Sequence, residues 1–356
     1  MGRLIPVILL SGFLLVDFSA VNLMMLPLPG ELLYATIGMN PGGHPDNVAL
    51  TLARLGHDGK DVTVFGTVGR DELGDLIEHR LASFGISSRL KRTEGSTGVT
   101  LALSVRGRDR SFIADPGANA SFDADALEAL LRELKPDIFY MASGALGEAD
   151  GRVAEVLALA KREGSMTFGD LVRRRDGDWG FAFQQLTYLD VFHVNASEAA
   201  DMTGAGPEDA ARALSRAGAG LAVVTKEDGL SASWDGGRQS LTQAGFRVEE
   251  VLDTTGAGDA FVAGLIEKVS KEGLPSTREE IEEQLLFAQA VAAVKVSGVS
   301  TTAISSAAVE KMLQKGERQK SNATRRAKSA GGLRTCSLPR IKKNLLGSTF
   351  KVGWVP

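Results

Sequence analysis

The stretch that decides the fold is Asp253-Thr254-Thr255-Gly256-Ala257-Gly258-Asp259-Ala260-Phe261. Its two glycines predict a tight turn that leads directly into a helix. Apolar residues at 260, 261, 263, 265 and 266 predict the buried face of that helix. Residues 246–252, just before the turn, predict an extended segment. The uncovered N–H groups at a helix start and the positive end of the helix dipole together form an anion site.

Asp259 falls in the first turn of the predicted helix, beside any anion held there. A carboxylate in that place can accept a proton from a hydroxyl group. The N–H groups of Gly256, Ala257 and Gly258 would meanwhile stabilise charge on a transferred group. A lone Gly-x-Gly-Asp matches by chance, however, and then indicates only a turn followed by a first-turn helix acid.

The complete nine-residue string is much more specific, because it resembles the signature of the PfkB/ribokinase family of sugar and nucleoside kinases. The resemblance implies that Asp259 is the catalytic base and that residues 256–259 form the anion hole. A second stretch, Gly42-Gly43-His44-Pro45-Asp46-Asn47-Val48-Ala49, is similar to the family's other signature. It implies that Gly42, Gly43 and Asn47 hold the sugar. From the residues alone, Asp46 or Asn47 could equally cap a helix.

Helices and strands alternate from residue 124 onward, which predicts a doubly wound α/β fold with ligands at the carboxyl ends of the strands. The resemblance extends this to a ribokinase-like, mostly parallel sheet flanked by helices, with a small β lid from about 18–40 and 96–115. Residues 1–312 would form the kinase domain. Residues 313–356 would be a basic, disordered extension, since Lys315 and the residues after it contain 11 Lys and Arg against one acid, Glu317. A solvated basic tail of this kind does not predict a nucleic-acid partner.

Residues 4–16 form an apolar run that allows two interpretations, a secretory signal or a buried strand at Val7–Leu10. The strand is favoured, because the motifs further along require a first strand. The run is too short to span a membrane, so a cytoplasmic protein is expected. Gly12 and Asp17 have the spacing with which relatives end this strand, and the resemblance implies that Asp17 grips sugar hydroxyls.

Three more positions match sugar-side residues of the family: Asn119, Asp170 and Arg173. A surface turn remains the alternative for Asn119, and a solvated loop is equally open for the neighbouring Arg174 and Arg175. On the nucleotide side, Asn195-Ala196-Ser197-Glu198 matches the family's Asn-x-x-Glu, whose Glu acts on Mg²⁺ through water. The same four residues also fit a helix cap.

The resemblance further implies an ATP site and a K⁺ site. In relatives the loop at Lys226–Gly229 borders the nucleotide, but here it is one residue short. A K⁺ ion would sit at Asp253 and Ser300. The residues implied for ATP are Asn195, Thr225, Gly229, Thr255, Gly258, Ala288 and Ala292.

The predicted function is therefore ATP-dependent phosphorylation of a hydroxyl group on a small sugar. Two alternatives remain open: a nucleoside kinase of the same family, and a sugar-binding protein without turnover. The single cysteine, Cys336, excludes an internal disulfide framework. The chain contains no P-loop, and Phe261 replaces the third glycine of a dinucleotide-binding fingerprint. A homodimer that pairs through the lid is a further expectation from the family.

Overall fold

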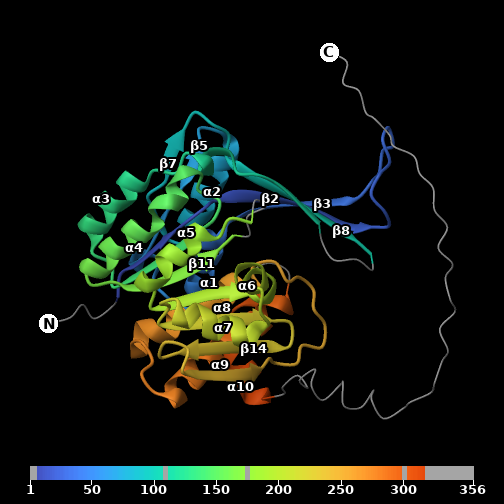
Figure 1. The fold of residues 1–356 in the computed structure, drawn as a ribbon. Helices are drawn as coiled ribbons and strands as arrows, with labels where there is room; N and C mark the ends of the chain where they lie inside the picture. Colours follow the sequence, from blue (N-terminus) through green and yellow to red (C-terminus); the bar gives the residue numbers. More distant parts are fainter. Residues whose placement is uncertain (1–5, 107–110, 173–176, 299–302, 317–356) are drawn as a thin grey trace, which may run out of the picture. The chain divides into compact units, whose positions relative to one another are not determined.

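The computed structural model describes residues 6–106, 111–172, 177–298 and 303–316 (Figure 1). All of them belong to one compact unit, Met1–Gln319. A nine-stranded sheet forms its centre, in the order β15-β14-β13-β12-β11-β10-β1-β4-β6. All neighbouring strands pair in parallel except for the pairs β13–β14 and β14–β15, which are antiparallel. These strands are β1 (Ile8–Ser11), β4 (Val62–Phe65), β6 (Ser87–Ser88), β10 (Ile138–Ser143), β11 (Met166–Leu171), β12 (Val191–Asn195), β13 (Leu221–Lys226), β14 (Gly229–Trp234) and β15 (Gln239–Ala244).

Helices cover both faces of this sheet, because its central strands are apolar on both sides. Along β1, Ile8 and Leu10 join one buried cluster, and Leu9 joins another on the opposite face. The first cluster contains residues of α1 (His44–Leu55), α2 (Glu72–Ser83), α8 (Ala257–Glu272) and α9 (Arg278–Val296). The second contains residues of α3 (Ala124–Leu134), α4 (Val153–Arg162), α5 (Gly180–Gln185), α6 (Ala196–Thr203) and α7 (Pro207–Arg216). The helix α10 (Ser306–Lys315) packs on α9.

A separate four-stranded sheet, in the order β3-β2-β8-β9, extends from the side of the main body (Figure 1). We call it the lid sheet; its strands are β2 (Leu15–Leu23), β3 (Thr36–Gly42), β8 (Gly98–Val105) and β9 (Ser111–Asp115). β2 pairs antiparallel with β3 and parallel with β8, and β8 and β9 form an antiparallel pair. A third, two-stranded sheet joins β5 (Thr67–Gly69) and β7 (Lys91–Thr93).

The predicted doubly wound, mostly parallel sheet is confirmed, and the apolar run at the N-terminus contributes β1, which lies between β10 and β4 in the interior of the sheet. One local prediction is wrong: Asp17 does not end β1 but lies inside β2 of the lid sheet. Residues 246–252, predicted to be extended, belong to no named strand, and Leu252 donates its N–H to the carbonyl of Val296 at the end of α9.

Short 3₁₀ turns complete the described elements, at Gly59–Asp61, Gly117–Ala120, Glu148–Arg152 and Leu186–Tyr188. Among the described residues, no helix combines the length and the apolar character that a membrane crossing requires.

Candidate active site

The turn before α8 forms the predicted helix start. Gly256 caps the helix with φ 73°, a left-handed conformation that glycine adopts without strain. Ala257 uses its N–H within the turn, where it donates to the carbonyl of Thr254 at 3.2 Å. The ring of His193 lies directly below Gly258, and a Cβ added to this glycine would come within 3.2 Å of it. Gly256, Ala257 and Gly258 all line a cavity in front of the start of α8, where an anion could approach the helix end.

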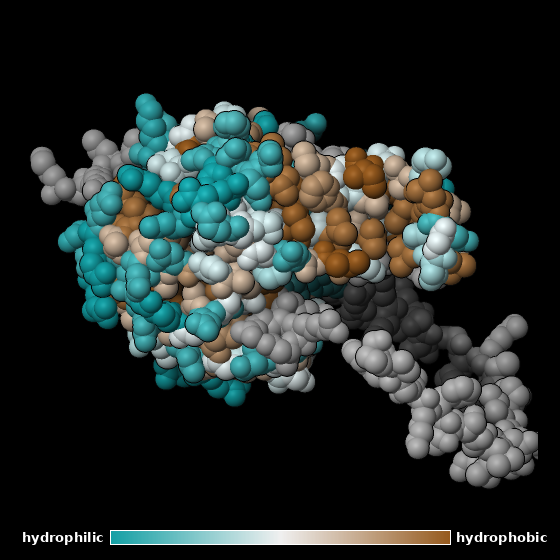
Figure 2. All heavy atoms as spheres, turned by 90° about the horizontal axis from the view of Figure 1, so that it is seen from above, coloured by the Kyte–Doolittle hydropathy of each residue, from teal (hydrophilic) through white to brown (hydrophobic). Residues whose placement is uncertain are grey.

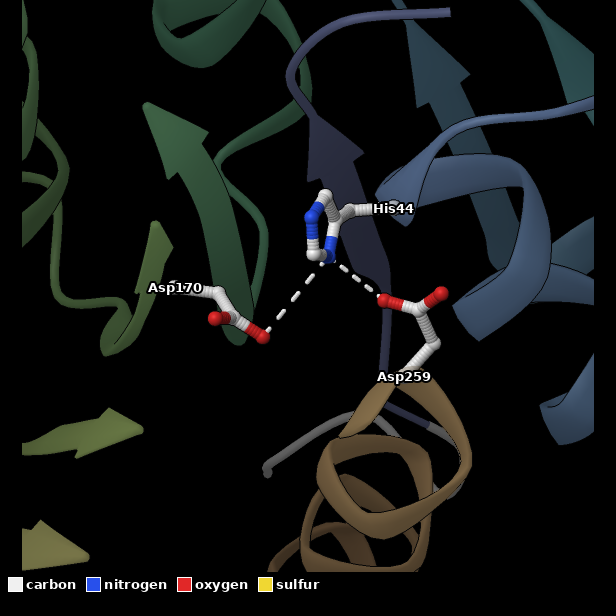
Figure 3. A group of neighbouring side chains, drawn as sticks. All are labelled: His44, Asp170 and Asp259. Carbon is white, nitrogen blue, oxygen red and sulfur yellow. Dashed lines mark ion pairs between the residues drawn. The ribbon is translucent and has the colours of Figure 1, made fainter. Parts of the chain in front are cut away.

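Asp259 is 5% exposed, and two residues of α1 hold its two carboxylate oxygens. Asn47 donates from Nδ2 to Oδ2 at 2.8 Å. The Nδ1 atom of His44 lies 2.6 Å from Oδ1, as an ion pair (Figure 3). One turn of α1 thus fixes the orientation of the predicted base.

The N-cap of α1 is Gly43 and not Asp46 or Asn47, so His44 is the first residue of the helix. Gly43 has φ 101°, and a Cβ there would lie 2.3 Å from the carbonyl oxygen of Phe13. Burial lowers the pKa of His44, but the charge of Asp259 and its hydrogen bond outweigh burial and raise it to about 10. His44 is therefore an imidazolium at neutral pH.

A second carboxylate, Asp170 at the end of β11, faces His44 from the other side at 3.8 Å (Figure 3). The Oδ2 atom of Asp170 also lies 3.1 Å from Nδ1 of His193, and the other ring nitrogen of His193 lies 3.0 Å from the hydroxyl of Thr225. Burial opposes both charges, but the ion pair lowers the pKa of Asp170 and raises that of His193. Tyr140 also contacts Asp170, at 3.5 Å. The site therefore contains two neighbouring histidine–carboxylate pairs, His44 with Asp259 and His193 with Asp170.

A cavity of about 810 Å³ opens beside these residues, in the size range of small-molecule sites. The start of α8 and the ends of β11, β12 and β13 form its polar side, while Ala292, Ala293 and Val296 of α9 contribute apolar wall. Several residues predicted for phosphoryl transfer or for the nucleotide line the cavity: Asn195, Glu198, Thr225, Gly229, Ala292 and the turn 256–259. Thr255 and Ala288, both predicted for the nucleotide, do not line it. Ala288 is fully buried against Gly264 of α8, where an added Cβ would lie 2.8 Å from the Cα of Ala288.

The shortened loop at Lys226–Gly229 is a two-residue hairpin in which Lys226 pairs with Gly229 across β13 and β14. Gly229 has φ 148°, and a Cβ there would lie 2.1 Å from the carbonyl oxygen of Gln243. Lys226, Glu227 and Gly229 all line the cavity. The tight turn at Lys226–Gly229 therefore forms part of the cavity wall.

The geometry of Asn195-x-x-Glu198 shows the predicted helix cap and also places Glu198 beside the cavity. Asn195 caps α6, its Oδ1 accepts the N–H groups of Ser197 and Glu198, and Glu198 returns a carboxylate oxygen to the N–H of Asn195. Glu198 also lines the cavity. Burial, followed by the charge of Asp170, raises the pKa of Glu198 to about 7. Glu198 therefore completes the cap of α6 and at the same time presents its carboxyl group to the cavity.

Four residues predicted to hold a sugar lie at the junction of the lid sheet and α1, namely Asp17, Gly42, Gly43 and Asn47. Asp170, also predicted for the sugar, lies instead in the wall of the cavity. Gly42 ends β3, and a Cβ there would come within 2.6 Å of a carboxylate oxygen of Asp17. Burial and the charge of Asp259 raise the pKa of Asp17 to about 6. Asp46 is fully buried and faces Arg80 at 3.6 Å. Asn119 is buried as well, and its amide bonds the backbone of Leu14 and Pro116.

The predicted K⁺ position at Asp253 holds a lysine. Lys295, near the end of α9, donates from Nζ to the Oδ2 atom of Asp253 at 3.0 Å and to its carbonyl oxygen at 3.1 Å. The Oδ1 atom of Asp253 accepts the N–H of Thr255. The other K⁺ residue predicted from the sequence, Ser300, lies outside the described residues, as does Arg173 on the sugar side.

Residues 15–308 match the model of the pfkB family of carbohydrate kinases. The chain belongs to this family. Its members transfer a phosphoryl group to an alcohol group of a carbohydrate, so the chain is a phosphotransferase of the pfkB family.

Curated relatives of this pfkB chain include a fructokinase of Klebsiella pneumoniae, which is 26% identical over 268 residues. That match covers 71% of this chain and 85% of the relative. A probable chloroplastic fructokinase of Arabidopsis thaliana is 29% identical over 297 residues, and the match covers 77% of this chain and 75% of the relative. The ribokinase of Giardia lamblia superimposes with a TM-score of 0.77 at 20% identity, over 88% of this chain and 99% of its own. This likeness confirms the ribokinase-like fold.

Sequence reasoning missed three charged residues of the pfkB site. His44 stands inside the quoted Gly-Gly motif, so its place next to the base was open to inference from the sequence. His193 stands two residues before Asn195 on a buried strand, where a polar residue is itself a signal. Lys295 is a lone lysine in the apolar end of α9, and it is 2% exposed. A buried lysine needs a partner, which points to the nearest carboxylate.

Proposed function

We propose that this pfkB family member transfers the γ-phosphoryl group of ATP to a hydroxyl group of a small sugar. The observation that carries the proposal is the place of Asp259. Its carboxylate lies in the first turn of α8, at the wall of an 810 Å³ cavity, and is oriented by Asn47. A proton acceptor and an anion-binding helix start are thereby combined at one point.

The nucleotide would occupy the cavity beside α8 and α9. Its apolar wall at Ala292, Ala293 and Val296 suits the flat face of a base, and the helix start suits the phosphates. Solved structures of similar fold support ATP: a ribokinase of Arabidopsis thaliana was determined with ribose and ATP, and a fructokinase of Xylella fastidiosa with ATP. The chain is 23% and 24% identical to them, respectively.

The residues around the cavity also suit Mg²⁺. Asp170, Glu198 and Asp259 place three carboxyl groups near the same wall, and burial, followed by the charge of Asp170, raises the pKa of Glu198. A putative ribokinase II of E. coli was determined with ATP and Mg²⁺. Glu198 would hold the ion through water, since Mg²⁺ keeps several of its water ligands in such sites. The ion would supply charge neutralisation between the phosphates.

In the proposed reaction Asp259 takes the proton of the sugar hydroxyl. The freed oxygen forms a bond to the γ-phosphorus while the bond from that phosphorus to the bridging oxygen breaks, and ADP leaves. Backbone N–H groups of the turn at Gly256 and Gly258 would stabilise the negative charge that spreads over the transferred group. The imidazolium of His44 adds a positive charge 2.6 Å from the base.

The sugar would lie between the lid sheet and α1, where Asp17, Gly43 and Asn47 are placed. An ionised Asp17 can accept two hydroxyl hydrogens, and Asn47 can both donate and accept. Asn119 is committed to backbone carbonyls and one N–H, so we assign it to holding residue 14 in place rather than to the sugar.

ADP formation over a panel of sugars and nucleosides tests this function. Because several curated relatives are fructokinases, D-fructose and D-ribose come first, followed by other ketoses, aldoses, sugar acids and nucleosides. We expect a sugar to give the highest kcat/KM. A nucleoside with the highest kcat/KM would reassign the chain to the nucleoside kinases of the family. Sugar binding in calorimetry without ADP formation for any compound would refute the kinase proposal.

We further propose that two copies pair through the lid sheet. Figure 2 shows apolar residues gathered on the part of the molecule that the lid sheet forms. Ile37, Phe112 and Ile113 are more than half exposed there, and so is Tyr34 in the segment between β2 and β3. Exposed apolar area of this kind marks an interaction surface in a soluble protein.

A further inference from the structure

Lys295 and Asp253 form a buried ion pair directly under the turn that would hold the transferred phosphoryl group. The side chain of Lys295 is 2% exposed and that of Asp253 is 25% exposed. The ammonium group reaches a carboxylate oxygen and the carbonyl oxygen of the same residue. These are oxygen ligands of the kind that also bind an alkali cation.

The end of α9 also favours a positive charge beside Asp253. Lys295 lies in the last turn of α9, where the carbonyl groups give the helix end a partial negative charge. The carbonyl oxygen of Val296 accepts the N–H of Leu252 at 2.9 Å, which fastens the segment before the turn to this helix end. The end of α9, the carboxylate of Asp253 and its carbonyl oxygen thus together create a negative electrostatic potential at the ammonium group of Lys295.

A short series of contacts connects the ammonium group of Lys295 to the turn at the start of α8. The second oxygen of Asp253 accepts the N–H of Thr255 at 2.9 Å, and Gly256 follows as the cap of α8. Burial raises the pKa of Asp253, but this N–H and the ammonium group outweigh burial and lower it. The carboxylate is therefore ionised, and the cation beside it fixes the conformation of residues 253–256.

We propose that Lys295 is a built-in cation. Its ammonium group takes the position at Asp253 that a K⁺ ion would take, so the turn is ordered without any bound monovalent cation. The K⁺ site expected at Asp253 does not fit the residues present, because the lysine already provides the charge. Lys295 is a positioning residue: it acts on the turn through Asp253 and Thr255. The kinetic consequence rests on the proposed kinase function, whereas the structural consequence does not.

The structural consequence is tested by thermal unfolding in KCl and in choline chloride at equal ionic strength. The wild-type protein should have the same midpoint in both salts. Lys295→Ala removes the ammonium group and leaves room for an ion, so K⁺ should raise its midpoint by about 1–3 °C over choline. Lys295→Met keeps the volume without the charge, and its midpoint should be lower than that of the wild type in both salts. Lys271→Ala on the exposed side of α8 is the control and should show no difference between the salts.

A midpoint of the wild-type protein that rises in K⁺ but not in choline would overturn the proposal, and so would a folded Lys295→Ala protein that does not distinguish the two salts. If Lys295→Ala folds only in KCl, the proposal is supported. If it folds in neither salt, the wild-type comparison still decides.

Turnover provides the second readout once a substrate is known. Wild-type kcat should change less than about twofold between the salts, and Lys295→Ala should lose about tenfold or more in choline and regain part of this in KCl. Absence of turnover with every compound would refute the kinase function and leave the unfolding result intact.

Discussion

Asn47 and Asp259 lie 212 positions apart in the sequence, and the amide of the first donates to the carboxylate of the second at 2.8 Å. This bond connects the two family signatures. One signature starts α1 at the edge of the lid sheet, and the other starts α8 at the wall of the cavity. The proposed sugar site and the proposed phosphoryl-transfer site therefore meet at a single carboxylate.

Replacement of that carboxylate should separate chemistry from binding. Asp259→Asn keeps the size of the side chain but removes the proton acceptor. We expect kcat to fall by about 10²–10⁴-fold, the usual contribution of a general base. The dissociation constant for ATP, measured by calorimetry, should change little. A variant that retains most of its kcat would show that another group accepts the proton.

His44 should stabilise the fold in a pH-dependent way. Its pKa is raised from 6.5 to about 10, so the pairing with Asp259 contributes fully below pH 6.5 and is lost as the pH rises through about 10. The unfolding free energies of wild type and His44→Gln, measured in urea between pH 6 and about 10.5, should therefore converge with rising pH. A gap that stays constant over this range would contradict a charged His44. His79→Gln, a histidine on α2, is the control and should show no such convergence.

Binding of the sugar should depend on the ionisation of Asp17. Its pKa is raised to about 6, mainly by burial, so the acid form predominates below that pH and cannot accept two hydroxyl hydrogens. We expect KM for the sugar to fall as the pH rises through about 6, with a smaller change in KM for ATP. Asp17→Asn should raise KM for the sugar at pH 7 and flatten this pH profile. An unchanged profile in the variant would assign the titration to another group.

Replacement of Gly43 at the start of α1 should lower the unfolding free energy more than replacement of Gly56 at the other end of the helix. The two glycines have φ of 101° and 104°, but an added Cβ at Gly43 meets the carbonyl of Phe13 at 2.3 Å, while one at Gly56 meets nothing within 4 Å. Gly56→Ala should cost about 1–2 kcal/mol of unfolding free energy, the penalty of a left-handed alanine. Gly43→Ala should cost clearly more in the same urea titration. Equal costs would show that the backbone at Gly43 shifts freely.

The proposed pairing through the lid sheet predicts a dimer in light scattering. Ile37→Ser and Ile113→Ser, at side chains that are 64% and 61% exposed, should shift the mass toward the monomer while the unfolding free energy changes little. Leu274→Ser, at an exposed apolar side chain outside the lid sheet, is the control and should keep the dimer. A monomeric wild-type protein would contradict the pairing.

The sequence predicted the sheet and the centre of the site because both depend on local patterns. The buried run at β1 and the glycine turn before α8 each specify their structure within about ten residues. Asp17 was misplaced because nothing in its neighbourhood tells whether the strand after Gly12 continues the central sheet or starts the lid sheet; the pairing of β2 with β8 decides this from far along the chain. Ala288 was misjudged for a related reason. Small residues on a helix suit a flat ligand and a close helix neighbour equally, and here Gly264 of α8 is that neighbour.

The ion pair between His44 and Asp259 also matters for the proposed kinase when ATP is bound and the sugar is absent. A kinase with bound ATP and no sugar is exposed to attack by water on the γ-phosphate, and a free carboxylate would assist that attack. Here both oxygens of Asp259 are already engaged, by the amide of Asn47 and by the imidazolium of His44. A lone water molecule gains little by displacing them, whereas a sugar held by several hydroxyl groups can compensate for the lost contact. The same pair that orients the base would thereby suppress futile hydrolysis of ATP.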